Sequence, residues 1–433
     1  MTAANVRRAL DWHLRTPFFY GWLIVGMAIL AGYGASGASQ LVLGALQVYI
    51  FEDLGWSRST FALPITLGTW SAALLTPLAG RLADKHGPRW LMPLGAVTAG
   101  IVFFALSGMT AVWHFYSSFI IGRALISPTM GGVVSSTAVV NWFHEKRNTA
   151  LGFVSMAHPL GASLNIQVLQ FLSTNFGWRF AYRCLGAFSL VLTAGLFLFM
   201  RRRPEDLGMK PDGVDPAAPT ERGVSGLSIS GSGASNDWDV SAAVRTAPFW
   251  LVTITLTLAT VAISSINFHM VPYLREKGVP VEFATSSLAL SAFLGAVANT
   301  GWGWLSDRFT ARRCEIAALL FAAVMVVFLL NIEGIGMALL FAALWGIASR
   351  GEGILGQMII AQFYGRRSFG SIIGVMAPLQ TAALGSGPLL AAFVRDAAGS
   401  YYPLYVVFAI TYALSAILIY LARTPQRATA AAG

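Results

Sequence analysis

The sequence contains few charged residues. Only 11% of its 433 residues are Asp, Glu, Lys or Arg, whereas an average soluble domain has about 25%. Hydrophobic residues make up 56% of the chain, and the mean hydropathy is +0.64. This composition excludes a soluble globular protein and an intrinsically disordered chain.

Cysteine is also scarce, because Cys184 and Cys314 are the only two. There is no Cys-x-x-Cys pair or Cys/His cluster, so we expect no disulfide scaffold, no metal site and no cofactor. The sequence also has no G-x-x-x-x-G-K-[ST] phosphate loop, which argues against a primary pump. No nucleophile–base constellation is visible, and we therefore expect that the protein is not an enzyme.

Long apolar runs dominate the chain instead. A helix that spans a bilayer needs about 20 predominantly apolar residues. Small residues inside the runs would let such helices pack closely. The sequence therefore predicts an all-α integral membrane protein with twelve transmembrane helices, at 18–48, 59–80, 90–110, 113–141, 148–174, 179–200, 248–274, 284–306, 314–331, 336–361, 369–394 and 401–422.

One long polar stretch, residues 201–245, separates the first six runs from the last six. It is rich in Gly, Ser, Pro and Asp and is typical of a disordered cytoplasmic linker. The predicted organisation is an N-terminal six-helix bundle at 1–200, which includes a cytoplasmic N-terminal segment. The linker at 201–245 follows, and then a C-terminal bundle at 246–433 with a cytoplasmic tail.

The positive charge of the chain follows a membrane pattern. The formal net charge is +10, from 29 Lys and Arg against 19 Asp and Glu. If both termini are cytoplasmic, 21 of the 29 basic residues fall in inside segments and 6 in outside segments. This bias predicts a multi-pass protein of the cytoplasmic (inner) membrane with both termini in the cytoplasm. It also explains the basic excess without a nucleic-acid partner.

Two loops repeat the same pattern at equivalent places in the two halves. Residues 80–89 and residues 303–312 both fit G-x-L-x-D-[RK]-x-x-x-R. Any cytoplasmic turn can hold Gly, Asp and Arg, but matched positions make a chance repeat improbable. Duplicated six-helix halves are a transporter architecture.

The first of these loops resembles the signature motif of the major facilitator superfamily. Further phrases resemble a bacterial branch similar to monocarboxylate porters and oxalate–formate antiporters: 20–22, 55–58, 142–152, 177–182 and 204–213. The resemblance implies two pseudo-symmetric six-helix bundles. It also implies a conformational latch in the two loops, made by Gly80, Asp84, Arg89, Asp307 and Arg312.

Four ionisable residues fall at membrane depth. They are Arg123 in the fourth run, His158 in the fifth, and Arg350 and Glu352 in the tenth. Ionisable groups near the bilayer centre are costly and usually functional. For His158 the alternative is a packing histidine beside a kink at Pro159.

The two arginines lie on helices related by the repeat. Two guanidinium groups facing one cavity would suit a carboxylate, which arginine binds in a bidentate way. The alternative is a structural pair of Arg350 with Glu352, but residues two apart on a helix point different ways. Glu352 would then need another partner, either Arg123 or a proton.

Here the sequence departs from the family that it resembles. Carboxylate transporters of that family tend to place cations in helices one, eight or eleven, and this chain has no Lys or Arg in those runs. Each of the softer candidates for substrate binding could instead join helices by hydrogen bonds. They are Tyr33, Gln40, Asn165, Asn267, His269, Asn299 and Gln380.

These features predict secondary active transport of a small organic anion, a carboxylate in the leading interpretation, by alternating access. Coupling is either proton symport or anion exchange. The expected partners are the anion, protons and the lipid bilayer, with the chain acting as a monomer. One alternative is proton-coupled efflux of amphipathic compounds, and another is a membrane receptor that does not transport.

Overall fold

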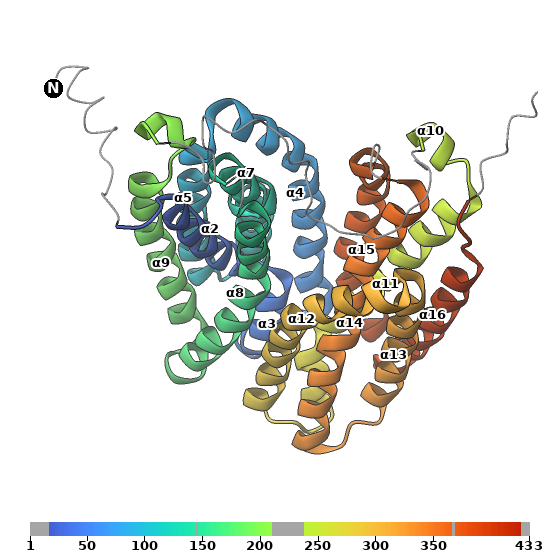
Figure 1. Ribbon diagram of the computed structural model, residues 1–433. Helices are drawn as coiled ribbons and strands as arrows, with labels where there is room; N and C mark the ends of the chain where they lie inside the picture. The colour runs from blue at the N-terminus through green and yellow to red at the C-terminus, as the bar shows by residue number, and fades with distance from the viewer. Residues whose placement is uncertain (1–16, 144–145, 210–237, 366–368, 426–433) are drawn as a thin grey trace, which may run out of the picture. The chain divides into compact units, whose positions relative to one another are not determined.

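The computed structural model describes residues 17–143, 146–209, 238–365 and 369–425. Throughout these residues the chain is helical, with no strand (Figure 1). Within them, eleven segments are long and apolar enough to cross a membrane. The prediction of an all-α integral membrane protein is thereby confirmed.

The described part of the chain belongs to two compact units. The first unit spans Met1–Trp56 and Leu63–Ser228, and the second spans Ser57–Ala62 and Ile229–Gly433. The short segment Ser57–Ala62 therefore packs with the second unit although it precedes most of the first. The predicted division at the linker did not include this exchange.

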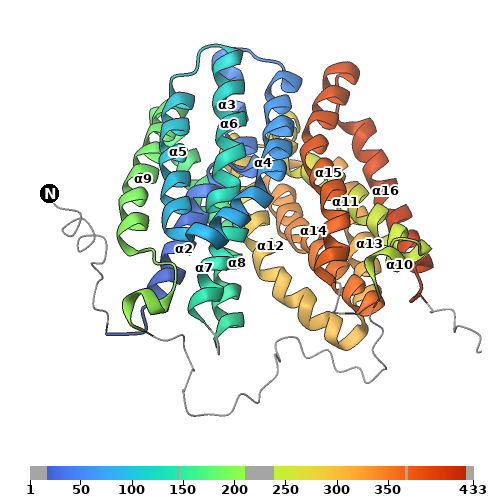
Figure 2. The same ribbon diagram turned by 90° about the horizontal axis from the view of Figure 1, so that it is seen from above.

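The described residues of the first unit form eight α-helices and one 3-10 helix, although α4 begins in the segment assigned to the second unit. They are α2 (Gly21–Ser36), α3 (Gln40–Leu54), α4 (Arg58–His86), α5 (Pro88–Ser107), α6 (Val112–Met130), α7 (Gly132–Trp142), α8 (Arg147–Phe176), α9 (Trp178–Phe199) and the 3-10 helix η1 (Pro204–Leu207). Within this unit α2 packs on α8, and α5 packs on both α6 and α9, as Figure 2 shows for α5 and its two neighbours.

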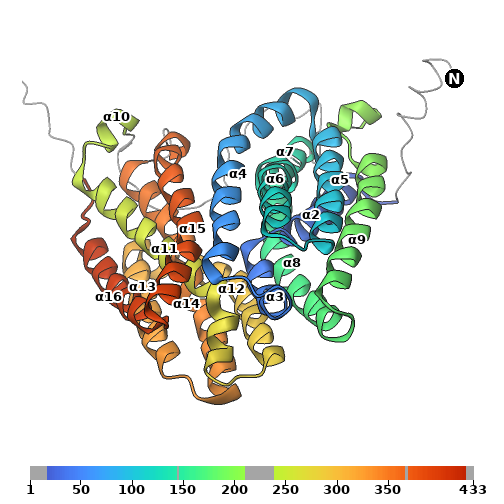
Figure 3. The same cartoon turned by 180° about the vertical axis from the view of Figure 1, so that it is seen from behind.

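The described residues of the second unit form six long helices and one short helix. These are α10 (Val240–Ala243), α11 (Ala247–Glu276), α12 (Val281–Phe309), α13 (Ala311–Leu330), α14 (Gly334–Tyr364), α15 (Phe369–Ala398) and α16 (Tyr402–Leu421). Within it α12 packs on α14, α11 on α15, and α13 on both α14 and α16, the last pair lying side by side in Figure 3.

Two predicted spans are broken, and both are in the first unit. The run predicted at 18–48 is interrupted between Ser36 and Gln40. Its two parts, α2 and α3, lie within one apolar segment, Gly21–Leu54. The run predicted at 113–141 is interrupted at Gly131, between α6 and α7. Hydropathy does not register a break of one to three residues, because it is averaged over a window of about 19 residues.

The fifth predicted run, at 148–174, forms α8, which has 30 residues. It is not among the eleven apolar segments, because polar side chains such as His158, Asn165 and Gln170 lower its hydropathy. Asn165 is fully buried and Gln170 is nearly so. The helix uses these polar groups inside the unit, which is consistent with interhelical hydrogen bonding in a membrane.

Both ends of the predicted linker are folded. Pro204–Leu207 form η1, and Val240–Ala243 form α10. Trp238 donates its backbone N–H to the carbonyl of Tyr364 at 3.0 Å, and the two rings pack edge to face. The expectation of an unstructured stretch over all of 201–245 is therefore too broad, and its centre, 210–237, lies outside the described residues, as does the N-terminal segment 1–16.

Candidate functional site

Arg123 lies on α6 beside the break between α2 and α3. Its guanidinium donates a hydrogen bond from Nη1 to the carbonyl of Ala38 at 2.8 Å. Ala38 belongs to the non-helical residues of the break, whose carbonyls lack helical partners. Within the described residues, Arg123 forms no ion pair with a carboxylate. The structure therefore gives this arginine a role in holding the broken helix.

Two further residues stabilise the same break. The side chain of Asn165 on α8 donates to the carbonyl of Tyr33 at 3.0 Å and to the hydroxyl of Ser36 at 2.8 Å. The hydroxyl of Ser39 accepts a bond from the backbone of Val42 at 3.4 Å and caps α3. The last turn of α2 and the first turn of α3 are thus fixed by side chains.

The other predicted residues of the first unit are placed as follows. Tyr33 is half-buried, and its ring packs edge to face on Phe188 with the centroids 5.2 Å apart. His158 lies on α8 with an exposed side chain. The predicted shared cavity of Arg123 and Arg350 stays a prediction, because the two belong to different units.

Arg350 occupies the middle of α14 in the second unit and is half-buried. A β-carbon at position 295 of α12 would lie 2.7 Å from its Cγ, so Gly295 leaves room for the arginine stem. Within the described part of the chain the guanidinium has no hydrogen bond and no ion pair, although the charge of Glu352 acts on it. This cation is positioned by packing and keeps its donors available.

Glu352 lies two residues further along α14 and is 6% exposed. It is bonded by Thr260 of α11, whose hydroxyl donates to Oε1 at 3.1 Å. Its second oxygen, Oε2, is buried without a hydrogen-bond partner. The predicted absence of a direct Arg350–Glu352 ion pair is consistent with this geometry, and the partner of Glu352 is a threonine that the sequence had not suggested.

Sequence reasoning missed a second buried carboxylate, Glu315. It lies in the first turns of α13 and has no exposed surface. Neither carboxylate oxygen has a hydrogen-bond partner, and the side chain interacts electrostatically with Glu352. Tyr412 of α16 interacts with both carboxylates. Glu315 falls at the start of the predicted run 314–331, two residues after Arg313, and it was not among the predicted site residues.

The softer candidates differ among themselves. Asn267 is 8% exposed, and its carbonyl oxygen accepts a bond from the indole of Trp345 at 2.8 Å, so it joins α11 to α14. Asn299 on α12 and Gln380 on α15 are half-buried and have no hydrogen bond among the described residues. These last two side chains keep their amide groups available.

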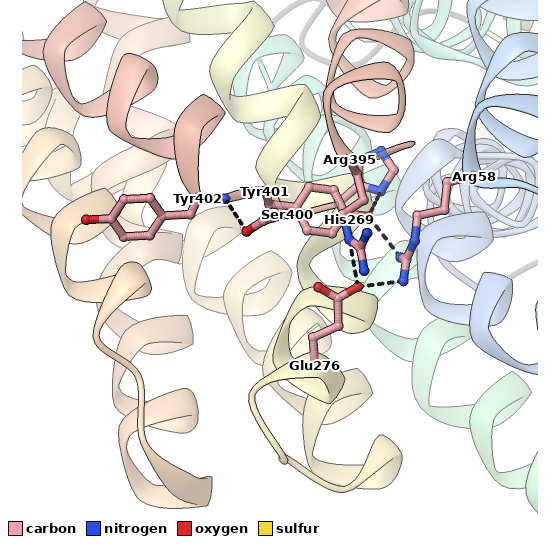
Figure 4. A network of polar contacts seen from close by, with 7 residues as sticks. All are labelled: Arg58, His269, Glu276, Arg395, Ser400, Tyr401 and Tyr402. Carbon is pink, nitrogen blue, oxygen red and sulfur yellow. Dashed lines mark hydrogen bonds and ion pairs between the residues drawn. The ribbon is translucent and has the colours of Figure 1, made fainter. Parts of the chain in front are cut away.

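A polar network that sequence reasoning did not identify lies at the end of α11 (Figure 4). Glu276 accepts from Arg58 at 2.6 Å and from Arg395 at 3.2 Å. Arg58 also donates to the hydroxyl of Tyr401 at 2.9 Å, and that hydroxyl lies 2.9 Å from Nδ1 of His269. The network attaches the segment Ser57–Ala62 to the second unit. The basic members had entered the sequence analysis only as topology charges.

The two repeated loops are similar in part. Arg312, the second residue of α13, donates to the carbonyls of Ile419 and Tyr420 at the end of α16. Arg89, the second residue of α5, lies 5.9 Å from the ring of Phe197 near the end of α9. Each arginine thus contacts the last turn of the sixth helix of its unit, where a cation is favoured.

The remaining latch residues support no structural assignment. Gly80 is a half-buried residue of α4, and Asp307 is exposed at the end of α12. Asp84 falls within α4, but its side chain lies outside the described residues. The latch stays a prediction. Among the described side chains, no three His, Cys, Asp or Glu gather as metal ligands.

The helices and the duplicated loop define a multi-pass α-helical membrane protein of the secondary-transporter class. The family model described as Major Facilitator Superfamily matches residues 24–330 of this chain. The chain therefore belongs to the major facilitator superfamily and is a membrane transporter rather than an enzyme. The resemblance seen in the loop motif is confirmed.

Similar proteins agree with this assignment. Monocarboxylate transporter 13 of Bos taurus is 24% identical over 410 residues, 90% of this chain and 86% of that protein. The membrane sensor protein UhpC of Salmonella typhimurium is 24% identical over 279 residues, 62% of this chain and 60% of that protein.

Among solved structures, a bacterial homologue of the human lysosomal transporter Spinster, in an inward-facing and occupied conformation, is similar with a TM-score of 0.71. It is 15% identical, and the match covers 95% of this chain and 98% of that chain. At this identity the likeness shows the fold alone. The predicted fold of two six-helix bundles is thereby confirmed.

Proposed function

We propose that this transporter moves a small organic anion of the carboxylate class by alternating access, with Arg350 as its principal binding cation. The observation that carries the proposal is a mid-helix guanidinium with no hydrogen bond or ion pair in the described residues. A charge at membrane depth is costly without a partner. A substrate carboxylate would supply a bidentate one.

The carboxylate class has independent support from a similar protein. A relative that matches 90% of this chain is described as a monocarboxylate transporter. The relative described as a sensor matches a shorter part, 62%. The alternative of a receptor that does not transport therefore has less support, and no observation favours the efflux of amphipathic compounds.

The pair of Glu352 and Glu315 is our proposed site for a coupled proton. Both side chains are buried, they interact with each other, and three of their four oxygens have no donor. Two buried carboxylates that repel each other do not both ionise without large cost. Protonation of one member would make proton symport possible, whereas a permanently protonated pair would leave anion exchange.

Two substitutions of Arg350 provide a graded test of the anion site. Arg350→Lys keeps the charge but loses the planar fork, so we expect weaker affinity without complete loss. Arg350→Gln removes the charge and should abolish uptake. The matched control is Arg313→Gln, because Arg313 is an exposed arginine of the same unit. Uptake of labelled monocarboxylates into proteoliposomes is the measurement.

Neutral analogues test the substrate class in the same assay. Uncharged amides of the same acids should neither be transported nor compete with the acids. Transport of the amides at the rate of the acids would contradict the assignment of an anion. So would unchanged uptake by Arg350→Gln.

The orientation in the membrane belongs to the same proposal. The distribution of 21 inside against 6 outside basic residues supports a bacterial cytoplasmic membrane with both termini in the cytoplasm, and we propose a monomer as the working unit. Protease should cut between residues 210 and 237 in inside-out vesicles and should spare intact cells. Cleavage from outside would overturn the orientation.

A further inference from the structure

The first unit contains a strongly basic cavity that has no part in the transport site proposed above. It has a volume of about 380 Å³ and lies where the turn between α4 and α5 meets the chain that follows α9. Of the described residues that line it, His86, Arg89, Arg201 and Arg202 are basic and Asp206 is acidic. All of these residues belong to the first unit.

The walls of this cavity are fixed by contacts from several elements. Arg201 is 3% exposed, and its carbonyl accepts a bond from the indole of Trp142 on α7 at 3.3 Å. The carbonyl of Arg202 accepts one from Asn141 at 3.4 Å. The two arginines therefore lie on a backbone that is hydrogen-bonded to α7.

Gly87 shows how closely the two walls approach. Its φ is +80°, and a β-carbon there would lie 2.7 Å from Cγ of Arg202. A side chain at this position would be strained by the backbone and would displace the arginine. Gly87 thus allows both the turn between α4 and α5 and the close approach of Arg202.

The charge of the cavity favours an anionic ligand. Among the described residues of the lining, three arginines stand against one aspartate, so these side chains carry a formal excess of two positive charges, counting His86 as neutral. Asp206 is itself engaged, since it accepts a bond from the backbone N–H of Arg203 at 3.2 Å. Clustered arginines present planar forks that match the oxygens of a phosphate group.

The surroundings of the cavity indicate a lipid rather than a solute. Trp90 lines the cavity and is 53% exposed, and its ring packs against Phe197 of α9. Tryptophan is enriched where the headgroups meet the hydrocarbon. Further along α5, Leu94 and Ile101 are each 61% exposed and form an apolar face that leads away from the cavity. A phosphate in the cavity would leave acyl chains lying along that face.

We propose that this cavity binds the phosphate of an anionic phospholipid headgroup, with Arg201 and Arg202 as its main ligands and the exposed face of α5 as the acyl contact. Such a lipid would join the turn after α4 to the segment after α9. The proposal is independent of the substrate. Its main ligands, Arg201 and Arg202, are not latch residues, although Arg89 lines the cavity and also belongs to the predicted latch.

The test uses the full chain, purified and delipidated, with phosphatidylglycerol as the probe and native mass spectrometry as the readout. Arg202→Gln should weaken binding of phosphatidylglycerol by about fivefold, the value of one arginine near an anionic surface. The matched control is Arg203→Gln, because Arg203 is adjacent, exposed and not part of the cavity lining. It should change binding by less than about twofold.

Two further measurements, of folding and of competition by inorganic phosphate, complete the test. The melting temperature of lipid-free Arg202→Gln should match that of the wild type, which shows that the variant is folded. Inorganic phosphate at millimolar concentration should not displace phosphatidylglycerol. Equal binding by both variants would overturn the site, and displacement by inorganic phosphate would show that a soluble phosphate, not a lipid, is the ligand.

Discussion

The two units each have an arginine at membrane depth, but the surroundings of the two differ. Arg123 donates to a backbone carbonyl at a helix break, 2.8 Å away. Arg350 has no such bond within the described residues and lies near the carboxylate of Glu352. A cation at membrane depth is therefore not by itself evidence of a substrate site, because the free carbonyls of a broken helix can also bind it.

The difference extends to the helices themselves. The first unit has two interrupted spans, at Gly37–Ser39 and at Gly131, whereas α11 to α16 each continue without interruption over the residues described. Broken helices expose carbonyls that need donors, and continuous helices do not. This explains why an arginine is engaged in the first unit and available in the second.

Glu352→Gln is expected to give the largest effect. Loss of the titratable group should reduce uptake against a concentration gradient to background, while exchange of substrate stays within about twofold of wild type. Proteoliposomes with an imposed pH gradient measure the first rate, and counterflow measures the second. Uphill uptake at the wild-type rate would show that Glu352 does not carry the coupled proton.

The two repeated loops allow a comparison between the units. Asp84→Asn should lower transport about tenfold without loss of membrane insertion or substrate binding. In the proposed latch, the carboxylate is stabilised at the N-terminus of a neighbouring helix, and the amide would lose that interaction. The matched change Asp307→Asn, at an exposed residue, should have a smaller effect. Wild-type uptake by Asp84→Asn vesicles would contradict the latch.

Arg123→Gln should mainly affect stability. It removes a charged donor from the carbonyl of Ala38, a loss of about 1–3 kcal/mol. The melting temperature in detergent should fall, while substrate affinity stays within about twofold of wild type. If affinity fell and stability did not, Arg123 would be a binding residue and the contrast with Arg350 would be lost.

Arg312→Gln is expected to give the smallest effect. This arginine bonds two carbonyls at the end of α16, an interaction worth about 0.3–1 kcal/mol. Arg313 is its exposed neighbour, and Arg313→Gln should change stability by less than about 0.5 kcal/mol. Indistinguishable melting curves for the two variants would show that the contact to α16 contributes nothing.

Much of the fold could be predicted because hydropathy directly reflects the cost of placing side chains in lipid. The runs, the two halves and the membrane depth of Arg350 and Glu352 all follow from that cost. The break before Gln40 could not be predicted in this way, since backbone hydrogen bonds leave little trace in composition. Gly37 and Ser39 were the available signals, and glycine is common throughout such helices.

The surroundings of the site depended on tertiary packing. Glu315 stands next to loop arginines in the sequence, and only the packing of α13 on α14 brings it near Glu352. Thr260 became the partner of Glu352 for the same reason. The cavity lined by Arg201 and Arg202 also depends on tertiary packing, because it forms where the segment after α9 meets the α4–α5 turn.

The central claim is that Arg350 is the substrate cation and Arg123 is not. Calorimetric titration of a monocarboxylate into purified Arg350→Gln and Arg123→Gln tests both halves together. Arg350→Gln should lose about 2–5 kcal/mol of binding free energy, and Arg123→Gln should stay near the wild type. Affinity of Arg350→Gln within about twofold of wild type, roughly 0.4 kcal/mol, would contradict the claim.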